Sequence, residues 1–307
     1  MGFDGRPMTA KRIIITGAGG FVGRALIAAL GAEYDIIALD NRLAGIDGIE
    51  GDISDPAIIS RAFAGGCDAV VHLATVPGGA AELNPPLAKQ VNVDASMALV
   101  EAATASGACP TFIFASSIAV FGDPLPSHVD DETQVSPKML YGAHKAMMEQ
   151  WIATQSRRGA INGISLRLPG IVARPRTDSG MKSAFMSDVF HALKTGETFV
   201  APVSPDATMW LMSAGCIAQN IIHALLLEKS AQTLTLPALR VRFADLVTEI
   251  ALQTGSDPQC VSYSPDAVLE AAFGKLPPLS TPKADILGFR HDGSLGMLVT
   301  AALSVIE

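Results

Sequence analysis

A glycine-rich stretch near the start of the chain, TGAGGFVG at residues 16–23, constrains the fold more than any other feature. It stands directly between an apolar run that predicts a strand (12–16) and an amphipathic pattern that predicts a helix (21–30). Such spacing gives a tight turn, close approach of backbone N–H groups to a pyrophosphate, and close helix–strand packing. The stretch therefore predicts a nucleotide-binding strand–turn–helix unit. The glycines that carry the spacing are Gly17, Gly20 and Gly23.

Short apolar runs and longer helical patterns continue to alternate through the first half of the chain. This alternation is typical of a parallel sheet whose strands are joined by crossover helices. The sequence thus predicts an α/β fold of the Rossmann type, with a doubly wound parallel sheet. Further strands are expected at 35–39, 69–73, 111–115 and 163–168, and helices after Pro56, at 86–106 and at 139–157.

After Pro169 the alternation fades, and proline and glycine recur between helical patterns. We interpret residues 11–169 as a nucleotide-binding domain and residues 170–307 as mainly a smaller substrate-binding region. The boundary is soft, because the second region can return a late strand to the sheet.

Composition limits the classes of protein to which the chain can belong. Hydrophobic residues make up 49% of the 307 and charged residues 17%, which supports a well-filled core. The net charge of −8 disfavours a nucleic acid or an anionic membrane as partner. No apolar run reaches bilayer length and residues 1–10 show no signal-peptide pattern, so a cytoplasmic location is expected. The four cysteines lack Cys-x-x-Cys spacing, so no metal site is expected.

An acidic residue follows the second expected strand. Asp40 stands 23 residues after Gly17, where a carboxylate accepts hydrogen bonds from an adenosine ribose and repels the 2′-phosphate of NADP. NAD is therefore favoured over NADP, although Arg42 could hold a phosphate and Asp40 could be an ordinary turn residue. Asp52 and Ile53 are candidates for framing adenine, with a helix-capping aspartate as the alternative.

A tyrosine and a lysine four residues apart are the candidate acid–base pair. Tyr141 and Lys145 lie in the helix expected at 139–157, which puts both on one face. A free tyrosine, with a pKa of about 10, is a poor proton shuttle near neutral pH, and an adjacent cation favours its phenolate. The same pair also occurs on ordinary surface helices. Ser117 supplies a hydroxyl from the preceding strand, while its neighbour Ser116 points to the opposite face.

Five motifs, TGAGGFVG, GDI, VVHLA, FASSIAVFG and YGAHK, occur in this order. With them the chain resembles the extended branch of the short-chain dehydrogenase/reductase superfamily over residues 12–175. The resemblance implies that Ser117 polarises the substrate oxygen, that Tyr141 is the general acid/base, and that Lys145 binds the nicotinamide ribose and tunes Tyr141. The cofactor residues that it implies are Gly17, Gly19, Gly20, Phe21, Val22, Gly23, Asp40, Asn41, Asp52, Ile53, Leu73, Ala74, Thr75, Asn92, Tyr141, Lys145 and Pro169.

The second half departs from the sugar-nucleotide enzymes of this branch. Phe121 replaces a common tyrosine, and WLMSAGC at 210–216 lacks the basic residue and the His-Val-Asp-Asp pattern typical there. The stretches SLRLPGIVARP, APVSPD, LTLPALRV and ILGFRHDGS are instead similar to the family of D-erythronate dehydrogenases and related sugar-acid dehydrogenases. This similarity implies that NAD oxidises a secondary alcohol of a small polyhydroxy acid such as D-erythronate.

A polyhydroxy acid needs a partner for its carboxylate. Arg174 is the candidate, because a guanidinium binds a carboxylate with two hydrogen bonds, and Arg176 is the reserve. Both can equally be surface arginines of a proline-rich loop. Trp210 is a candidate for a pocket wall or for the core. The other expected substrate contacts are Thr75, Ser117 and Tyr141.

Two other functions and the oligomeric state remain open. A nucleotide-sugar epimerase or dehydratase would retain NAD through its cycle, and a dinucleotide sensor would have no need of a proton relay. The helices expected at 86–106 and 139–157 carry apolar residues beyond one stripe. In the family that the chain resembles these two helices often pair across a dimer axis, so a homodimer is expected. The alternative is that all these residues face the sheet.

Overall fold

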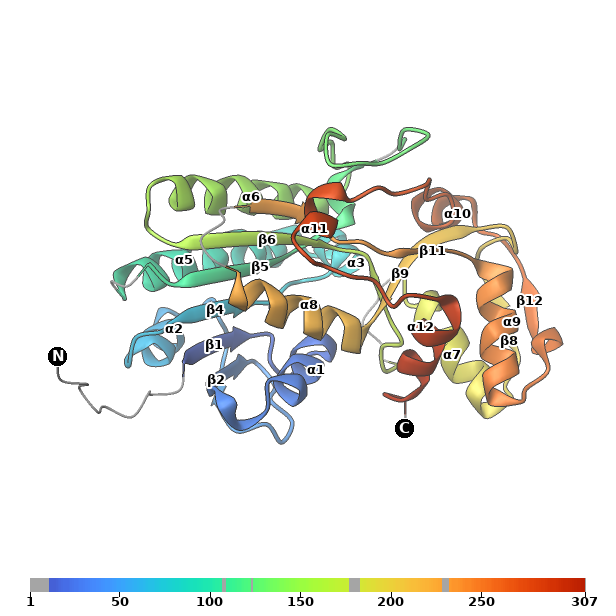
Figure 1. Ribbon diagram of the computed structural model, residues 1–307, viewed down its shortest axis with the longest axis horizontal. Coiled ribbons are helices and arrows are strands. Elements are labelled where there is room, and N and C mark those ends of the chain that lie inside the picture. Colours follow the sequence, from blue (N-terminus) through green and yellow to red (C-terminus); the bar gives the residue numbers. More distant parts are fainter. Residues whose placement is uncertain (1–10, 107–108, 123, 177–182, 228–231, 307) are drawn as a thin grey trace.

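A seven-stranded parallel sheet with helices on both faces forms the centre of the protein (Figure 1). The computed structural model describes residues 11–106, 109–122, 124–176, 183–227 and 232–306. The order of the strands is β10-β6-β5-β4-β1-β2-β3. They are β1 (Arg12–Thr16), β2 (Asp35–Asp40), β3 (Ile49–Glu50), β4 (Ala69–His72), β5 (Thr111–Ser117), β6 (Asn162–Leu168) and β10 (Gln232–Thr235).

The direction of winding reverses between β1 and β4. From β1 the chain proceeds outward to β2 and β3, and then crosses back to continue through β4, β5 and β6 on the other side. In open α/β sheets, ligands bind outside the carboxyl ends of the strands at this reversal. The predicted Rossmann-type fold is confirmed, and its topology places the site beyond the ends of β1, β4 and β5.

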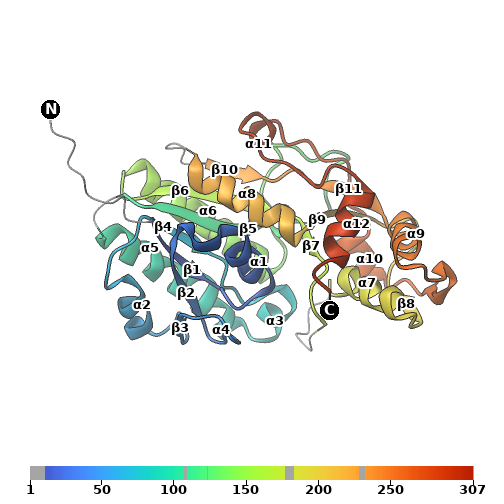
Figure 2. The same ribbon diagram turned by 60° about the horizontal axis from the view of Figure 1, so that its bottom comes forward.

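Each face of the sheet is covered by its own helices. Ile13 and Ile15 of β1 pack toward α1 (Phe21–Leu30) and α8 (Ala214–Leu226), which lie side by side (Figure 2). Ile14 faces the other layer, which contains α2, α5 and α6. A strand buried on both faces reads as a continuous apolar run, which explains the sequence RIIIT. The helices of the second layer are α2 (Pro56–Phe63), α5 (Ser96–Ala105) and α6 (Leu140–Arg157).

The long helix expected at 86–106 contains a π-helical segment. It consists of α4 (Pro85–Lys89), a π segment (Gln90–Ala95) and α5. A short helix, α3 (Gly78–Leu83), precedes it. π-Helical turns are rare and frequently occur at functional sites. This one carries Asn92, whose side chain contacts the loop after β4.

The second half of the chain contributes to two cores. Its β10 pairs with β6 in the central sheet, and α8 and α11 (Pro282–Ile286) pack in the core beside that sheet. Most of the rest surrounds a separate core in which Phe185, Phe190 and Phe243 are buried. That region contains β7 (Gly170–Val172), β8 (Phe199–Ala201), β9 (Thr208–Ser213), β11 (Leu239–Arg242), β12 (Val261–Tyr263), α7 (Phe185–Thr195), α9 (Phe243–Thr254), α10 (Ala267–Phe273) and α12 (Leu295–Leu303).

Residues 1–10, where the sequence shows no signal-peptide pattern, lie outside the described residues. Within the part of the chain that the structure describes, no helix is both long enough and apolar enough to cross a membrane.

Candidate active site

The glycine-rich loop connects β1 to α1 at the carboxyl edge of the sheet. Gly17 has a φ of +71°, and a Cβ there would lie 2.6 Å from the backbone nitrogen of Ala74. A Cβ on Gly23 would collide with the carbonyl oxygen of Gly17. Gly20 is the N-cap of α1 and brings no side chain to the helix N-terminus. The loop is therefore a tight cradle in which only glycine fits at positions 17 and 23, and the N–H groups at the helix N-terminus fit a pyrophosphate.

The carboxylate of Asp40 is fixed beside this loop. Its Oδ2 accepts a hydrogen bond from the backbone N–H of Gly19 at 3.0 Å, and its Oδ1 accepts one from that of Arg42 at 3.0 Å. Arg24 reinforces the junction, because its guanidinium donates to the carbonyl oxygens of Gly19 and Leu43, at 2.9 Å in each case. The geometry fits an adenosine ribose held at the end of β2. The side chain of Arg42 is exposed beside it.

Asn92 holds the loop that follows β4. Its Oδ1 accepts hydrogen bonds from the hydroxyl of Thr75 at 3.0 Å and from the N–H of Val76 at 2.7 Å. Its Nδ2 donates to the carbonyl oxygen of Val76 at 2.9 Å. Asn92 is 3% exposed, so it is a buried tether and not a solvated helix residue. The loop with Leu73 and Thr75 thereby has a fixed position next to the glycine loop.

A buried histidine at the end of β4 connects β1 with the start of α5. His72 Nδ1 lies 2.6 Å from the hydroxyl of Thr16, and its Nε2 lies 2.7 Å from that of Ser96. Ser96 donates its own proton to the carbonyl oxygen of Asn92, so His72 must donate through Nε2 and accept through Nδ1. Burial, and secondarily the charge of Lys145, lowers the pKa of His72 to about 3, which keeps the imidazole neutral.

The three expected catalytic side chains come together where β5 ends and α6 begins. The hydroxyls of Ser117 and Tyr141 are hydrogen-bonded to each other. Lys145 is 2% exposed, its Nζ donates to the carbonyl oxygen of Ala115 at 2.7 Å, and it lies 5.5 Å from the centre of the Tyr141 ring. Positions 141 and 145 thus share a helix face, as their spacing requires.

Burial dominates the electrostatics of this group. It raises the pKa of Tyr141, and the charge of Arg174 and the hydrogen bond from Ser117 act in the opposite direction. Burial also lowers the pKa of Lys145 to about 7, against the raising effect of Glu149. A low-dielectric site penalises both charged forms, so nearby charges determine whether the phenol can lose its proton near neutral pH.

Arg174 lies within this electrostatic neighbourhood. It follows β7, its Nε donates to the carbonyl oxygen of Ile171 at 3.3 Å, and its own carbonyl oxygen is 2.7 Å from Nε2 of His191. Burial lowers the pKa of the guanidinium, and the proximity of Tyr141 raises it. Arg176 behaves differently, because it forms an exposed ion pair with Glu197 at 2.8 Å.

A family model covers the segment that holds these residues. The model described as the NAD dependent epimerase/dehydratase family matches residues 13–212, which include the glycine loop, the three expected catalytic residues and Arg174. The chain belongs to the NAD dependent epimerase/dehydratase family.

Proteins that match most of this chain carry names that describe different activities. A D-erythronate dehydrogenase from Cupriavidus necator is 32% identical over 98% of this chain and 90% of its own length. Another from Haemophilus influenzae is 32% identical over 80% of this chain and 82% of its own. The crystal structure of a nucleoside-diphosphate-sugar epimerase from Agrobacterium tumefaciens has a TM-score of 0.88 with 26% identity, covering 99% of this chain and 97% of that one.

Two residues that the sequence left open in this epimerase/dehydratase family member have distinct surroundings. Ser116 donates its hydroxyl to Glu149 at 2.5 Å, so it is engaged away from Tyr141. Trp210 is 1% exposed and its indole N–H donates to the carbonyl oxygen of Pro277 at 2.8 Å. These contacts give Trp210 a packing role and leave almost none of the indole accessible to a ligand.

The remaining expected cofactor residues surround the same edge. Asp52 is exposed and accepts a hydrogen bond from the N–H of Ser54 at 2.8 Å, while Ile53 is buried. Pro169 is buried between β6 and β7. Asn41 is exposed next to Asp40.

Sequence reasoning missed three residues that shape the site of this family member. Arg24 connects loops that are distant in the sequence, and no local pattern marks such contacts. Glu149 stands one turn after Lys145, so extending the four-residue spacing by one step would have found it. Arg167, its partner, carries no comparable signal.

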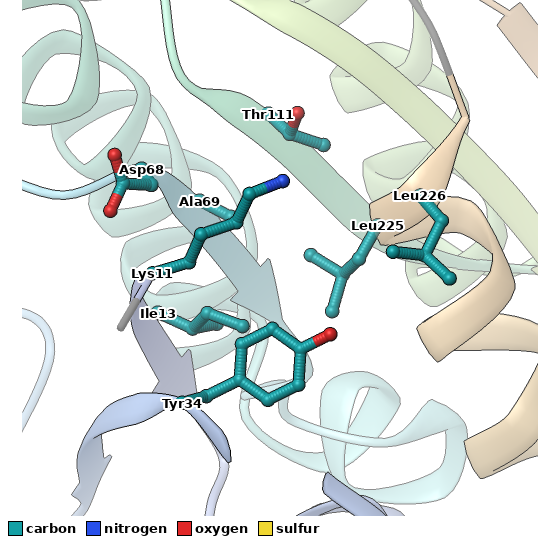
Figure 3. A pocket seen from close by; sticks show the side chains of 8 residues that line it. All are labelled: Lys11, Ile13, Tyr34, Asp68, Ala69, Thr111, Leu225 and Leu226. Carbon is teal, nitrogen blue, oxygen red and sulfur yellow. The ribbon is translucent and has the colours of Figure 1, made fainter. Parts of the chain in front are cut away.

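A cavity of about 200 Å³ lies at the opposite edge of the sheet (Figure 3). Lys11, Asp68 and Thr111 line it at the amino ends of β1, β4 and β5, together with Leu225 and Leu226 at the end of α8. The cavity lies at the amino ends of these strands and the candidate active site lies at their carboxyl ends. The two sites are therefore separate.

Proposed function

We propose that this protein is an NAD-dependent oxidoreductase that oxidises a secondary alcohol of a small polyhydroxy acid such as D-erythronate. The observation that carries the proposal is the partly buried guanidinium of Arg174 in the electrostatic neighbourhood of Tyr141. An acid–base group beside a partly buried cation suits a substrate that carries a hydroxyl close to a carboxylate. The names of the full-length relatives from Cupriavidus necator and Haemophilus influenzae support the same substrate class.

NAD, when bound, supplies the acceptor for the hydride. The cradle formed by Gly17, Gly20 and Gly23 would hold its pyrophosphate. Asp40 would accept hydrogen bonds from the adenosine ribose and disfavour NADP, and Lys145 would hold the nicotinamide ribose. The loop tethered by Asn92, together with Pro169, would line the nicotinamide end.

The protein's own groups then move one proton. Ser117 donates a hydrogen bond to the hydroxyl oxygen of the substrate. The phenolate of Tyr141 takes the hydroxyl proton, while the hydrogen on the same carbon leaves as hydride. The alcohol would thus become a ketone, the proton would rest on Tyr141, and bound NAD would supply the acceptor for the two electrons. Lys145 and Arg174 supply the positive charge that favours the phenolate before the substrate arrives.

Arg174 orients the substrate in this scheme. A guanidinium that forms two hydrogen bonds with a carboxylate fixes the neighbouring carbon relative to Tyr141 and Ser117. Thr75, whose hydroxyl donates to Asn92, is the proposed contact for a further substrate hydroxyl. Arg176 is engaged with Glu197 and is the less suitable clamp.

A screen for NADH formation tests the proposal. The purified protein is given NAD and a panel of four- to six-carbon aldonates, with matched neutral polyols and sugar nucleotides alongside. We expect NADH to accumulate with one or more aldonates and not with the sugar nucleotides. NADH formation that is equally fast with neutral polyols would contradict the proposal that the substrate is an acid.

A nucleotide-sugar epimerase or dehydratase is the second candidate. The full-length match to the Agrobacterium tumefaciens epimerase structure favours it. Such an enzyme would retain NAD through purification and would produce no net NADH. The segment WLMSAGC at 210–216, which lacks the polar residues typical of that branch, speaks against it.

We also propose a homodimer that pairs α5 and α6 of two copies. Met147 of α6 is 55% exposed, and Met97 of α5 is partly buried. An apolar side chain on an outer helix face is suited to burial in an interface. Light scattering at micromolar concentration tests this, with a monomer as the contrary result. A cytoplasmic location and the absence of a nucleic-acid partner stay predictions.

A further inference from the structure

Three successive residues of β5 contact three successive turns of α6. The carbonyl oxygen of Ala115 accepts from Lys145, the hydroxyl of Ser116 donates to Glu149, and the hydroxyl of Ser117 is bonded to Tyr141. The helix residues are spaced by four, so they form one row along α6. The proposed proton relay uses the first two members of this row. Glu149 is the third member, and it takes no direct part in that proton transfer.

Glu149 is buried and tightly held. It is 2% exposed, and its Oε1 and Oε2 accept hydrogen bonds from Nε and Nη2 of Arg167 at 3.0 and 2.8 Å. Arg167 is the register partner of Ser116 across β5 and β6, so both donors reach the carboxylate from one side of the sheet. Its guanidinium also lies 5.1 Å from the ring centre of Phe121. A buried charge persists only with such complete bonding, because its desolvation is costly.

We propose that Glu149 is a positioning residue of the proton relay, which keeps Lys145 charged and directed at the carbonyl of Ala115 through its negative charge one helical turn away. The inference rests on the proposed function. The surroundings of Lys145 explain why it needs a nearby negative charge, since this lysine is 2% exposed and its ammonium lies 4.6 Å from the centre of the Phe114 ring. Without a carboxylate close by, such a site favours the neutral amine.

The charged and titratable groups around Lys145 leave this role to Glu149. On α6 they are Tyr141, whose pKa is raised by burial, His144, whose pKa is lowered by burial, and Glu149 itself. On β4, His72 is neutral because its pKa is about 3. On β6, Arg167 is positive and is paired with the carboxylate. Glu149 therefore opposes the burial that lowers the pKa of Lys145 to about 7.

Glu149→Gln is the decisive variant, because it keeps the size and one hydrogen-bond acceptor but removes the charge. The pKa of Lys145 should fall further, so the lysine loses its proton at a lower pH. We expect the alkaline limb of the pH profile of kcat/KM to move about one pH unit toward acid, with about a tenfold lower rate above neutral pH. Glu149→Asp, which restores the charge, should return the limb toward that of the unmodified protein.

Two matched variants separate charge from structure. Arg167→Gln leaves the carboxylate without its cationic partner, and we expect the alkaline limb to move toward higher pH. Ser116→Ala removes a hydrogen bond but no charge, and should leave the limb in place. A purely structural role for Glu149 would instead lower the melting temperature of Glu149→Gln, Arg167→Gln and Ser116→Ala. It would move the alkaline limb of the pH profile in none of them.

The outcomes also distinguish this inference from the proposed function. Turnover retained by Tyr141→Phe would refute the relay itself. An inactive Tyr141→Phe combined with an unmoved limb in Glu149→Gln would refute the role of Glu149 alone. If the variant is too slow to assay, the pH dependence of NAD affinity, measured by quenching of protein fluorescence, reports the same lysine. An affinity profile identical to that of the unmodified protein would then overturn the inference.

Discussion

The half of this chain that is proposed to bind the nucleotide and the half that is proposed to bind the substrate are built in different ways. In the first, the expected contacts to the pyrophosphate and the adenosine ribose come from the ends of strands, namely the glycine loop after β1 and Asp40 at the end of β2. In the second, neighbouring strands come from distant segments, and β9 pairs with both β7 and β11. Local sequence therefore specifies the first half, whereas the second depends on which distant segments meet.

The same contrast applies to charge. The carboxylate of Asp40 accepts hydrogen bonds from the backbone N–H groups of Gly19 and Arg42, in the loops after β1 and β2, and lies at an accessible edge of the sheet. Arg174 is partly buried and is influenced by Tyr141, which lies on a different element. A cofactor common to many reactions is recognised by backbone geometry. A particular substrate is recognised by side chains whose placement depends on packing.

The largest expected effect concerns the residue where the two halves meet. Tyr141→Phe removes the hydroxyl that takes the substrate proton but keeps the ring. We expect turnover to fall by about a hundredfold to ten-thousandfold, with NAD affinity unchanged. Steady-state rates and NAD titration measure the two quantities. Tyr263→Phe, on β12 in the separate core of the second half, is the control and should retain activity. Retention of most of the rate by Tyr141→Phe would remove the acid/base role.

Arg174→Gln tests the substrate half alone. Loss of a charge-assisted hydrogen-bond pair should lower kcat/KM for aldonates by about tenfold to a hundredfold, and much less for neutral polyols. Arg176→Gln is the matched control, since it breaks only an exposed ion pair with Glu197. Equal losses with acids and with neutral polyols would contradict the carboxylate clamp.

Asp40→Ala tests the cofactor half alone. Without the carboxylate, the Michaelis constant for NAD should rise by about tenfold and the preference for NAD over NADP should narrow. The substrate preference should not change. Asp47→Ala, an exposed aspartate in the following loop, serves as the control. An unchanged ratio of NAD to NADP activity would show that the ribose contact is wrong.

The smallest expected effect on activity is that of Trp210→Phe. The change leaves the carbonyl oxygen of Pro277 without its buried donor and opens a small gap among Val120, Phe121 and Leu276. We expect stability to fall by about 1–3 kcal/mol, measured by denaturant unfolding, with substrate preference unchanged. A changed substrate preference at unchanged stability would return Trp210 to the pocket wall and would weaken the contrast between the halves.

Much of the first half could be predicted from sequence because its signals are local. The bounds of β1 and α1 agree with the apolar run and the helical pattern around the glycines. The preference for Ser117 over Ser116 followed from strand alternation, and Ser116 is indeed engaged with Glu149. The two-residue β3 was not predicted, since two residues show no periodicity. The π segment was missed because its sequence continues an ordinary helical pattern.

The sequence by itself determined the Rossmann-type sheet, the glycine cradle and the row formed by Tyr141 and Lys145, because strand and helix periods repeat over a few residues. Only the tertiary structure decided that Glu149 completes this row, that Arg174 lies near the phenol while Arg176 does not, and that Trp210 is core. Those outcomes depend on burial and on the charges of residues far apart in the chain. The environment of a side chain is a property of the packed molecule, and the pKa values of the relay follow from that environment.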